Sequence, residues 1–64
     1  MEGTVKFFNR ARGYGFISTP EGGKDAYVHR DDIVDGSELG EGDRVSFDIV
    51  QETRGPRAKN VKKL

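Results

Sequence analysis

Four side chains with rings stand at alternating positions of two short segments, where they could act together in binding: Tyr14, Phe16, Tyr27 and His29. Residues 12–17 place the first two rings on one face of a strand and small or branched residues on the other. Residues 26–29 repeat this arrangement with the other two rings. A flat aromatic surface on a sheet is the kind of site on which unpaired nucleobases stack.

The segment between the two strands favours an antiparallel hairpin. Residues 18–24 contain Pro20, Gly22 and Gly23, which are typical of turns. Pairing of the two strands would set two pairs of rings side by side. The hairpin therefore predicts one continuous aromatic face.

The aromatic face can be buried or exposed, and aromatic residues are usually buried. Two observations favour exposure here. His29 would need a polar partner in so small a core. The opposite face supplies residues of the sizes that fill a narrow barrel: Gly13, Gly15, Ile17, Ala26 and Val28. We therefore expect the rings to face outward.

Other chemistry is poorly supported. His29 is the only histidine and the chain has no cysteine, so no metal site can be assembled around it by a known pattern. No motif positions a nucleophile, and we predict that the protein is not an enzyme and uses no cofactor, metal or small-molecule substrate. The Gly13-x-Gly15 pair lacks the third glycine, the Lys-Ser/Thr pair and the following helix of a phosphate-binding loop. Its glycines more plausibly bend a strand and leave the neighbouring rings uncovered.

Length and composition predict one small domain over residues 1–64. Without disulfide or metal, its stability must come from tight packing of few apolar residues, and we expect it to be modest. The N-terminus has no apolar signal region and no apolar run approaches ~18 residues. We expect a soluble, cytoplasmic protein that does not engage a membrane.

The net charge is zero, which by itself argues against a polyanionic partner. Its distribution argues otherwise. Residues 1–30 carry a net charge of +2, residues 31–48 carry −6 and residues 49–64 carry +4. The aromatic hairpin thus lies in positive sequence, although ordinary solvated faces would also explain this pattern.

The remaining chain predicts three more strands and no substantial helix. Residues 3–9 and 44–50 have strand composition or alternation, and residues 57–63 form a last strand with Ala58 and Val61 directed inward. Residues 31–34 resemble one helical turn, residues 35–42 a loop and residues 53–56 a turn. Because a sheet this small must close to bury a core, we expect an all-β, five-stranded antiparallel barrel.

Four motifs, in order and at the right spacing, resemble the bacterial-type cold shock domain. Arg12-Gly-Tyr-Gly-Phe-Ile17 resembles its RNP1 motif and Ala26-Tyr-Val-His29 its RNP2 motif. Gly3-Thr-Val-Lys-Phe-Phe-Asn9 is similar to the opening strand, and Arg54-Gly-Pro56 to the last turn. The resemblance implies a Greek-key barrel of the OB-fold type. It also implies binding of single-stranded RNA and DNA and activity as a nucleic-acid chaperone, with regulation of transcription or translation in the cold shock response.

The resemblance also implies a set of binding residues. Most match positions of the family that bind bases or phosphates: Lys6, Phe7, Phe8, Arg12, Tyr14, Phe16, Tyr27, His29 and Arg54. Others match the rim of the site: Asn9, Asp25 and Pro56. Strict alternation, however, places Phe7 on the buried face with Val5, so that its exposure requires a bulge.

Three departures from the family pattern suggest a smaller and more electrostatic surface. Phe7 replaces the usual Trp, Arg30 replaces an aromatic residue, and the loop 35–42 is short and has no aromatic residue. Arg30 either stacks or contacts phosphate, or it pairs with Asp31 or Asp32.

These observations predict a monomer that binds single strands with little sequence preference. Two alternatives stay open at this point. The barrel could be a protein-interaction module that uses its aromatic face, or a regulator with a specific DNA target.

Overall fold

Five strands and one short 3₁₀ helix make up the computed structural model, which describes residues 1–19 and 23–64. The elements are β1 (Glu2–Asn9), β2 (Tyr14–Ser18), β3 (Ala26–His29), η1 (Arg30–Asp32), β4 (Arg44–Glu52) and β5 (Gly55–Lys63). The expected turn residues Pro20 and Gly22 lie outside the described residues. The hairpin that they were expected to close is confirmed, since β2 and β3 pair antiparallel from Tyr14↔His29 to Ile17↔Ala26.

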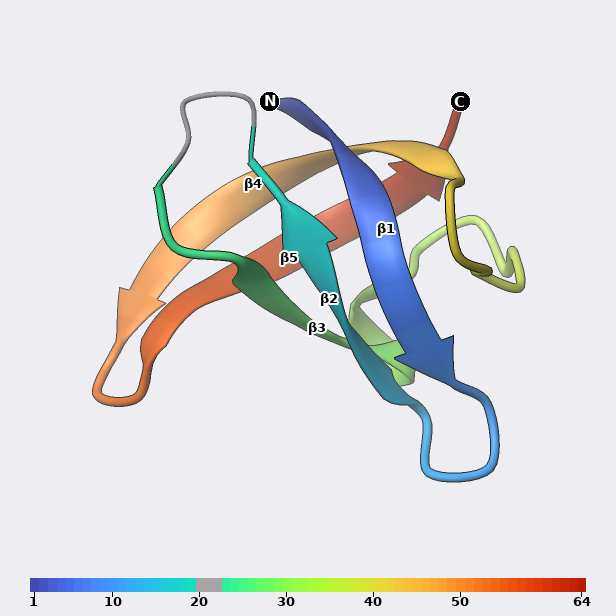
Figure 1. Ribbon diagram of the computed structural model, residues 1–64, viewed down its shortest axis with the longest axis horizontal. Coiled ribbons are helices and arrows are strands. Elements are labelled where there is room, and N and C mark those ends of the chain that lie inside the picture. Colours follow the sequence, from blue (N-terminus) through green and yellow to red (C-terminus); the bar gives the residue numbers. More distant parts are fainter. Residues whose placement is uncertain (20–22) are drawn as a thin grey trace.

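The strands close into a barrel in the order β1-β2-β3-β5-β4. Figure 1 shows β1, β2 and β3 lying across the long β4–β5 hairpin. This confirms the all-β, five-stranded barrel and is consistent with an OB-fold. The expectation of an antiparallel barrel needs one correction: β3 and β5 pair in parallel, at Tyr27↔Arg57. These two strands run in the same direction because the chain crosses from one to the other through η1, the following loop and β4.

Among the residues that the structure describes, the core consists of nine buried apolar side chains, most of them branched or small: Val5, Ile17, Ala26, Val28, Leu39, Val45, Phe47, Ala58 and Val61. The residues of β2, β3 and β5 that were expected to face inward are buried; Ala58 and Val61 lie three positions apart, and between them Asn60 has φ +53°. Leu39 is the exception to strand periodicity, because it reaches the core from the loop between η1 and β4. The loop thereby contributes a fully buried side chain that its glycine-rich sequence did not indicate.

Burial of one hairpin face settles the orientation of the other. Ile17, Ala26 and Val28 have no exposed surface. Tyr14, Phe16 and Tyr27 alternate with them and are only partly buried. The prediction that the rings face outward is therefore confirmed.

A bulge in β1 resolves the conflict over Phe7. The pairing of β1 with β2 runs from Val5↔Ile17 directly to Phe7↔Phe16, so one extra residue is accommodated on β1. After the bulge, the alternation of side chains between the two faces of β1 is displaced by one residue, so each side chain lies on the opposite face from the one that strict alternation predicts. Val5 is buried, whereas Phe7 is 42% exposed.

Several element boundaries differ from those expected by one to two residues. β2 begins at Tyr14 rather than at residue 12, because Gly13 has φ +75° and donates its N–H to the Asn9 carbonyl, which closes a turn. The β4–β5 turn is only Thr53–Arg54, since Gly55 (φ +128°) already belongs to β5. The helical turn begins one residue early and ends at residue 32.

Gly15 allows β1 and β2 to approach closely. A Cβ atom at this position would overlap the carbonyl oxygen of Phe7 and lie 2.8 Å from the Phe8 ring. The Phe7 oxygen and the Phe8 Cα, which would lie 2.9 Å from the new Cβ, are backbone atoms of β1, so the overlap is relieved only if the strand shifts. Gly15 is thus required by the close packing of β1 against β2. The sequence had instead suggested that this glycine bends the strand.

We expect Gly15→Ala to lower the free energy of unfolding by about 1–3 kcal/mol, because the methyl group overpacks the β1–β2 contact. Chemical denaturation measures the change. Gly40→Ala is the matched control, since a Cβ there meets nothing nearer than 3.7 Å. Equal stability of Gly15→Ala and the wild type would show that β1 does not lie this close to β2.

Asp32 is a buried carboxylate that ties η1 to β5. Its side chain is 6% exposed and accepts a hydrogen bond of 2.9 Å from Arg57 Nε, with Lys59 Nζ at 3.2 Å. Burial raises the pKa of the Asp32 carboxyl, but the hydrogen bonds and charges of Arg57 and Lys59 outweigh it and hold the pKa below its ordinary value. These ionic contacts link η1 to β5 next to Tyr27↔Arg57, where β3 pairs with β5.

The lowered pKa predicts a stability that depends on acid. An aspartate whose pKa is lower in the folded state stabilises the fold above its ordinary value of 3.8, and this contribution is lost as the pH falls through the folded pKa. We expect Asp32→Asn to be less stable at neutral pH by about 1–2 kcal/mol. Below about pH 4 the stability of the wild type should fall more steeply than that of the variant.

Thermal melts from about pH 7 to pH 2 measure this difference. Asp35 and Asp43 also have lowered pKa values, through hydrogen bonds from Ser37 and Gly40 respectively, so the variant keeps part of the acid dependence. The exposed turn residue Glu41, changed to Gln, is the control. Parallel acid profiles of wild type and Asp32→Asn would contradict the prediction.

Candidate nucleic-acid interface

Four aromatic rings form one cluster on the outer face of β1, β2 and β3. We call Phe7, Tyr14, Phe16 and Tyr27 the aromatic cluster. Their neighbouring ring centroids lie 5.7–6.4 Å apart, and Tyr14 and Tyr27 are nearly parallel, at 19°. The other contacts are tilted or edge-to-face, the geometry that aromatic pairs prefer. The cluster presents several ring faces and edges on a rigid sheet.

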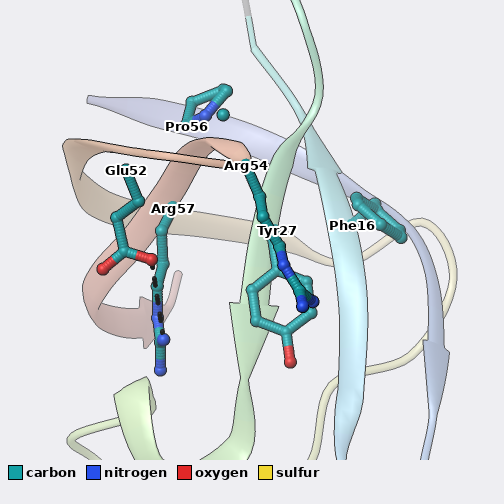
Figure 2. Close-up of a pocket in the computed structure, with 7 residues that line it drawn as sticks. Phe16, Tyr27, Glu52, Arg54, Pro56 and Arg57 are labelled. Atoms are coloured by element: carbon teal, nitrogen blue, oxygen red, sulfur yellow. Dashed lines mark ion pairs between the residues drawn. The ribbon is translucent and has the colours of Figure 1, made fainter.

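An open groove continues the aromatic cluster toward the β4–β5 turn. It is lined by Phe16, Tyr27, Glu52, Arg54, Gly55, Pro56 and Arg57. Figure 2 shows Tyr27 between Phe16 on one side and Arg57 on the other, with Arg54 lining the same groove. The groove brings the expected residues Arg54 and Pro56, from the far end of the chain, beside the two central rings.

His29 stands at the end of β3 and has a second, local role. It is the N-cap of η1, and its Nδ1 accepts a hydrogen bond of 3.1 Å from the backbone N–H of Asp31. In the neutral ring this leaves Nε2 as the N–H donor. The Asp31 carboxylate lies 3.4 Å from Nδ1. His29 pairs with Tyr14 across the strands, and so borders the aromatic cluster.

The basic residues expected to bind phosphate differ in whether they form ion pairs. Lys6 forms an ion pair with Asp25, with 3.0 Å between Nζ and Oδ2, so these two expected binding residues contact each other. In the described part of the chain, Arg12, Arg30 and Arg54 take part in no ion pair. The alternative in which Arg30 pairs with Asp31 or Asp32 is therefore not found, since those carboxylates contact other groups. The Arg30 side chain instead covers Gly13.

Two expected residues lie away from the ring contacts of the aromatic cluster. Phe8 is half-buried, packs against the core and lines a second hollow with Arg30. Asn9 accepts a hydrogen bond from the backbone N–H of Arg12 through its side-chain oxygen, at 3.1 Å. Asn9 thus shapes the turn that carries Arg12, and binding roles for these residues stay predictions.

Two residues of the groove were missed by sequence reasoning: Arg57 and Glu52. Arg57 was assigned to the last strand only as a basic residue. Its guanidinium lies over the ring of Tyr27, with Cζ 5.6 Å from the centroid, and 3.8 Å from the Glu52 carboxylate. The hydrogen bond to Asp32 raises the pKa of Arg57 further. Alternation from Ala58 would have placed Arg57 outside, but only the β3–β5 pairing brings it to Tyr27.

Many acidic residues of the middle third are engaged by basic residues or by backbone. Asp32 contacts Arg57 and Lys59, Glu38 lies 3.6 Å from Arg10, and Asp43 lies 3.3 Å from Lys63. Their ion pairs therefore neutralise part of the negative charge of the middle third. A neutral chain is thus compatible with a local site for a polyanion.

In the part of the chain that the structure describes, no helix is long and apolar enough to cross a membrane. No group of three or more His, Asp or Glu side chains in residues 1–19 and 23–64 is arranged to hold a metal ion.

Comparison with known proteins agrees with this geometry. A family model described as the "'Cold-shock' DNA-binding domain" matches residues 1–64. The chain is 55% identical to "Cold shock protein CspB" of Bacillus caldolyticus and 53% identical to "Cold shock protein CspD" of Bacillus subtilis, over all of this chain and 98% of each relative. It is 48% identical to a "Cold shock-like protein" of Aquifex aeolicus, over all of this chain and 94% of that protein.

The match spans all five strands, and thus includes the aromatic cluster and the groove beside it. The identities of 48–55% extend over the whole length of the chain. The chain therefore belongs to the cold-shock domain family of nucleic-acid-binding proteins.

Proposed function

We propose that this protein binds single-stranded RNA and DNA by stacking bases on the aromatic cluster. The observation that carries the proposal is the outward position of four rings on a sheet whose other face forms the core. Each stacked base contributes about 1–3 kcal/mol, whatever its identity, because every base has an aromatic face. Three or four stacked bases, less the cost of ordering the strand, correspond to a dissociation constant near micromolar or lower.

Cations around the aromatic cluster supply the contacts to phosphate. Arg12, Arg30 and Arg54 are exposed and lie near the ends of β1, β3 and β4, where a strand crossing the rings would pass. Lys6 joins them when its contact with Asp25 is exchanged for a phosphate. His29 contributes its ring and the Nε2 donor at the edge of the aromatic cluster.

The same binding mode makes the protein a nucleic-acid chaperone. A strand whose bases are stacked on protein cannot pair with itself, so binding opposes hairpins without any need for ATP or another cofactor. The protein acts as a monomer in the cytoplasm, and stacking confers little sequence preference. In a cell this activity would affect transcription or translation when RNA structure is stabilised by cold.

Competition between single and double strands tests the proposal. Stacking needs an uncovered base face, which a duplex does not offer. We expect a duplex to displace a labelled single-stranded heptamer at least about tenfold less well than a single strand of equal length, at physiological salt. Equal displacement would indicate a purely electrostatic binder. Binding that is nearly independent of salt, together with dimer formation, would instead indicate a protein-interaction module.

Phe16→Ala tests whether the aromatic cluster itself binds. We expect binding of a single-stranded heptamer to weaken by about 1–3 kcal/mol. The unfolding free energy should fall by only about 1 kcal/mol, because the ring loses tilted or edge-to-face contacts with three neighbours but leaves no cavity in the core.

Fluorescence titration and thermal melts measure the two changes separately. Val34→Ala is the control, since Val34 is an exposed apolar residue outside the aromatic cluster and should bind as the wild type does. A loss of about 3–5 kcal/mol in stability is expected for a core residue. Such a loss for Phe16→Ala, or unchanged binding, would overturn the role given to this ring.

A further inference from the structure

A neutral group of four charged residues borders the groove beside Tyr27. Asp32 accepts a hydrogen bond from Arg57 Nε and lies 3.2 Å from Lys59 Nζ, while Glu52 lies 3.8 Å from Arg57 Nη1. We call these four residues the ionic group. Two positive and two negative charges cancel within it. Arg57 therefore contributes less to the attraction of phosphate than Arg54, which has no ion pair among the described residues.

The ionic group holds the Arg57 guanidinium in one place. The Nε–H is used by a carboxylate that is 6% exposed, and the guanidinium lies over the ring of Tyr27, with Cζ 5.6 Å from the ring centroid. A guanidinium held on one side keeps its remaining N–H donors in a fixed orientation. Asp32 thus acts as a positioning residue for Arg57.

The groove keeps both donors and an acceptor available to a ligand. The contact of 3.8 Å between Arg57 Nη1 and Glu52 Oε1 is too long for a hydrogen bond. The two terminal nitrogens of Arg57 and the carboxylate of Glu52 can therefore hydrogen-bond to a third group. Both residues line the same groove as Phe16, Tyr27 and Pro56, whose surfaces can hold a base (Figure 2).

Guanine is the base that best complements this pair. Arginine donates to the O6 and N7 acceptors of guanine, the commonest specific contact of arginine with a base. A carboxylate only accepts, and guanine offers it two adjacent donors, N1–H and the N2 amino group, next to O6. Adenine and cytosine offer a single amino group, and uracil and thymine offer one N–H between two acceptors. In a single strand this edge is not covered by pairing.

We propose that Arg57 and Glu52 form a guanine-selective subsite, in which Asp32 positions Arg57. The inference rests on the proposed single-strand binding, to which it adds a base preference at one position of the bound strand. The preference comes from hydrogen bonds to a base edge. It is therefore separable from the phosphate contacts of Arg54, which depend on salt.

The experiment uses the full chain and heptathymidine in which one position at a time is replaced by guanine, adenine, cytosine or hypoxanthine. Affinities are measured by fluorescence titration at about 50 and 200 mM salt. At one position of the strand, we expect guanine to bind at least about fivefold more tightly than adenine. Hypoxanthine, which lacks the N2 amino group, should bind with intermediate affinity.

Variants separate the roles of the residues. Arg57→Gln should abolish the preference for guanine over adenine and leave the salt dependence unchanged. Glu52→Gln should remove the difference between guanine and hypoxanthine. Arg54→Gln is the matched control: it should keep the preference and lower the log–log salt slope by about 0.7, the value for one phosphate contact. Asp32→Asn should reduce the preference while heptathymidine affinity is retained.

Each other outcome has a distinct meaning. Equal affinity of the wild type for guanine and adenine at every position overturns the subsite, while binding of heptathymidine still supports single-strand binding. Failure to bind any heptamer overturns the proposed function itself. A uniform loss of affinity in Arg57→Gln with a lower salt slope shows a phosphate contact instead. A loss of thermal stability alone shows that Arg57 only supports the fold. Should Asp32→Asn unfold, the exposed substitution Glu52→Gln still decides the question.

Discussion

The interface depends on the two-residue period of β2 and β3 and on the small or branched residues that fill their inner face. Ile17, Ala26 and Val28 are fully buried, and together with glycines they fill the inner face of this hairpin. Because successive side chains of a strand point to opposite faces, burial of these residues places Tyr14 and Tyr27 outside. The residues that stabilise the barrel therefore also determine which residues can bind a ligand.

Extending the aromatic cluster onto β1 requires two local adjustments. The bulge after Val5 changes the face on which Phe7 lies, and so adds a third strand to the cluster. Gly15 lets β2 lie close beneath the Phe7 carbonyl, where any other side chain would separate the strands. Both features sit at the same contact between β1 and β2. The aromatic cluster is thus maintained by backbone geometry as much as by ring contacts.

Electrostatics explain how a chain without net charge can serve a polyanion. Carboxylates such as Asp32 and Asp43 are held by lysine and arginine residues of β5, so part of the acidic middle third is neutralised within the fold. A carboxylate paired with a lysine or arginine repels a phosphate backbone only weakly. Dissolved salt screens the residual field of such a pair, so that it does not act over long distances. Of the arginines without ion pairs among the described residues, Arg12 and Arg54 lie in turns and Arg30 begins η1.

The sequence by itself determined the fold class, the hairpin and the outward position of its rings. These follow from periodicity, turn residues and side-chain size, which are properties of neighbouring residues. It left open the exposure of Phe7 and the partners of Arg30, and it gave no indication of Leu39 in the core.

Only the tertiary structure decided those points, because they depend on contacts between distant segments. The bulge in β1 is a matter of its register with β2. The parallel pairing of β3 with β5 brings Arg57 to Tyr27, and the position of η1 brings Asp32 to Arg57. Residues that lie 25 or 30 positions apart in the chain carry no periodicity that relates them. Closure of the barrel is the physical cause of their proximity.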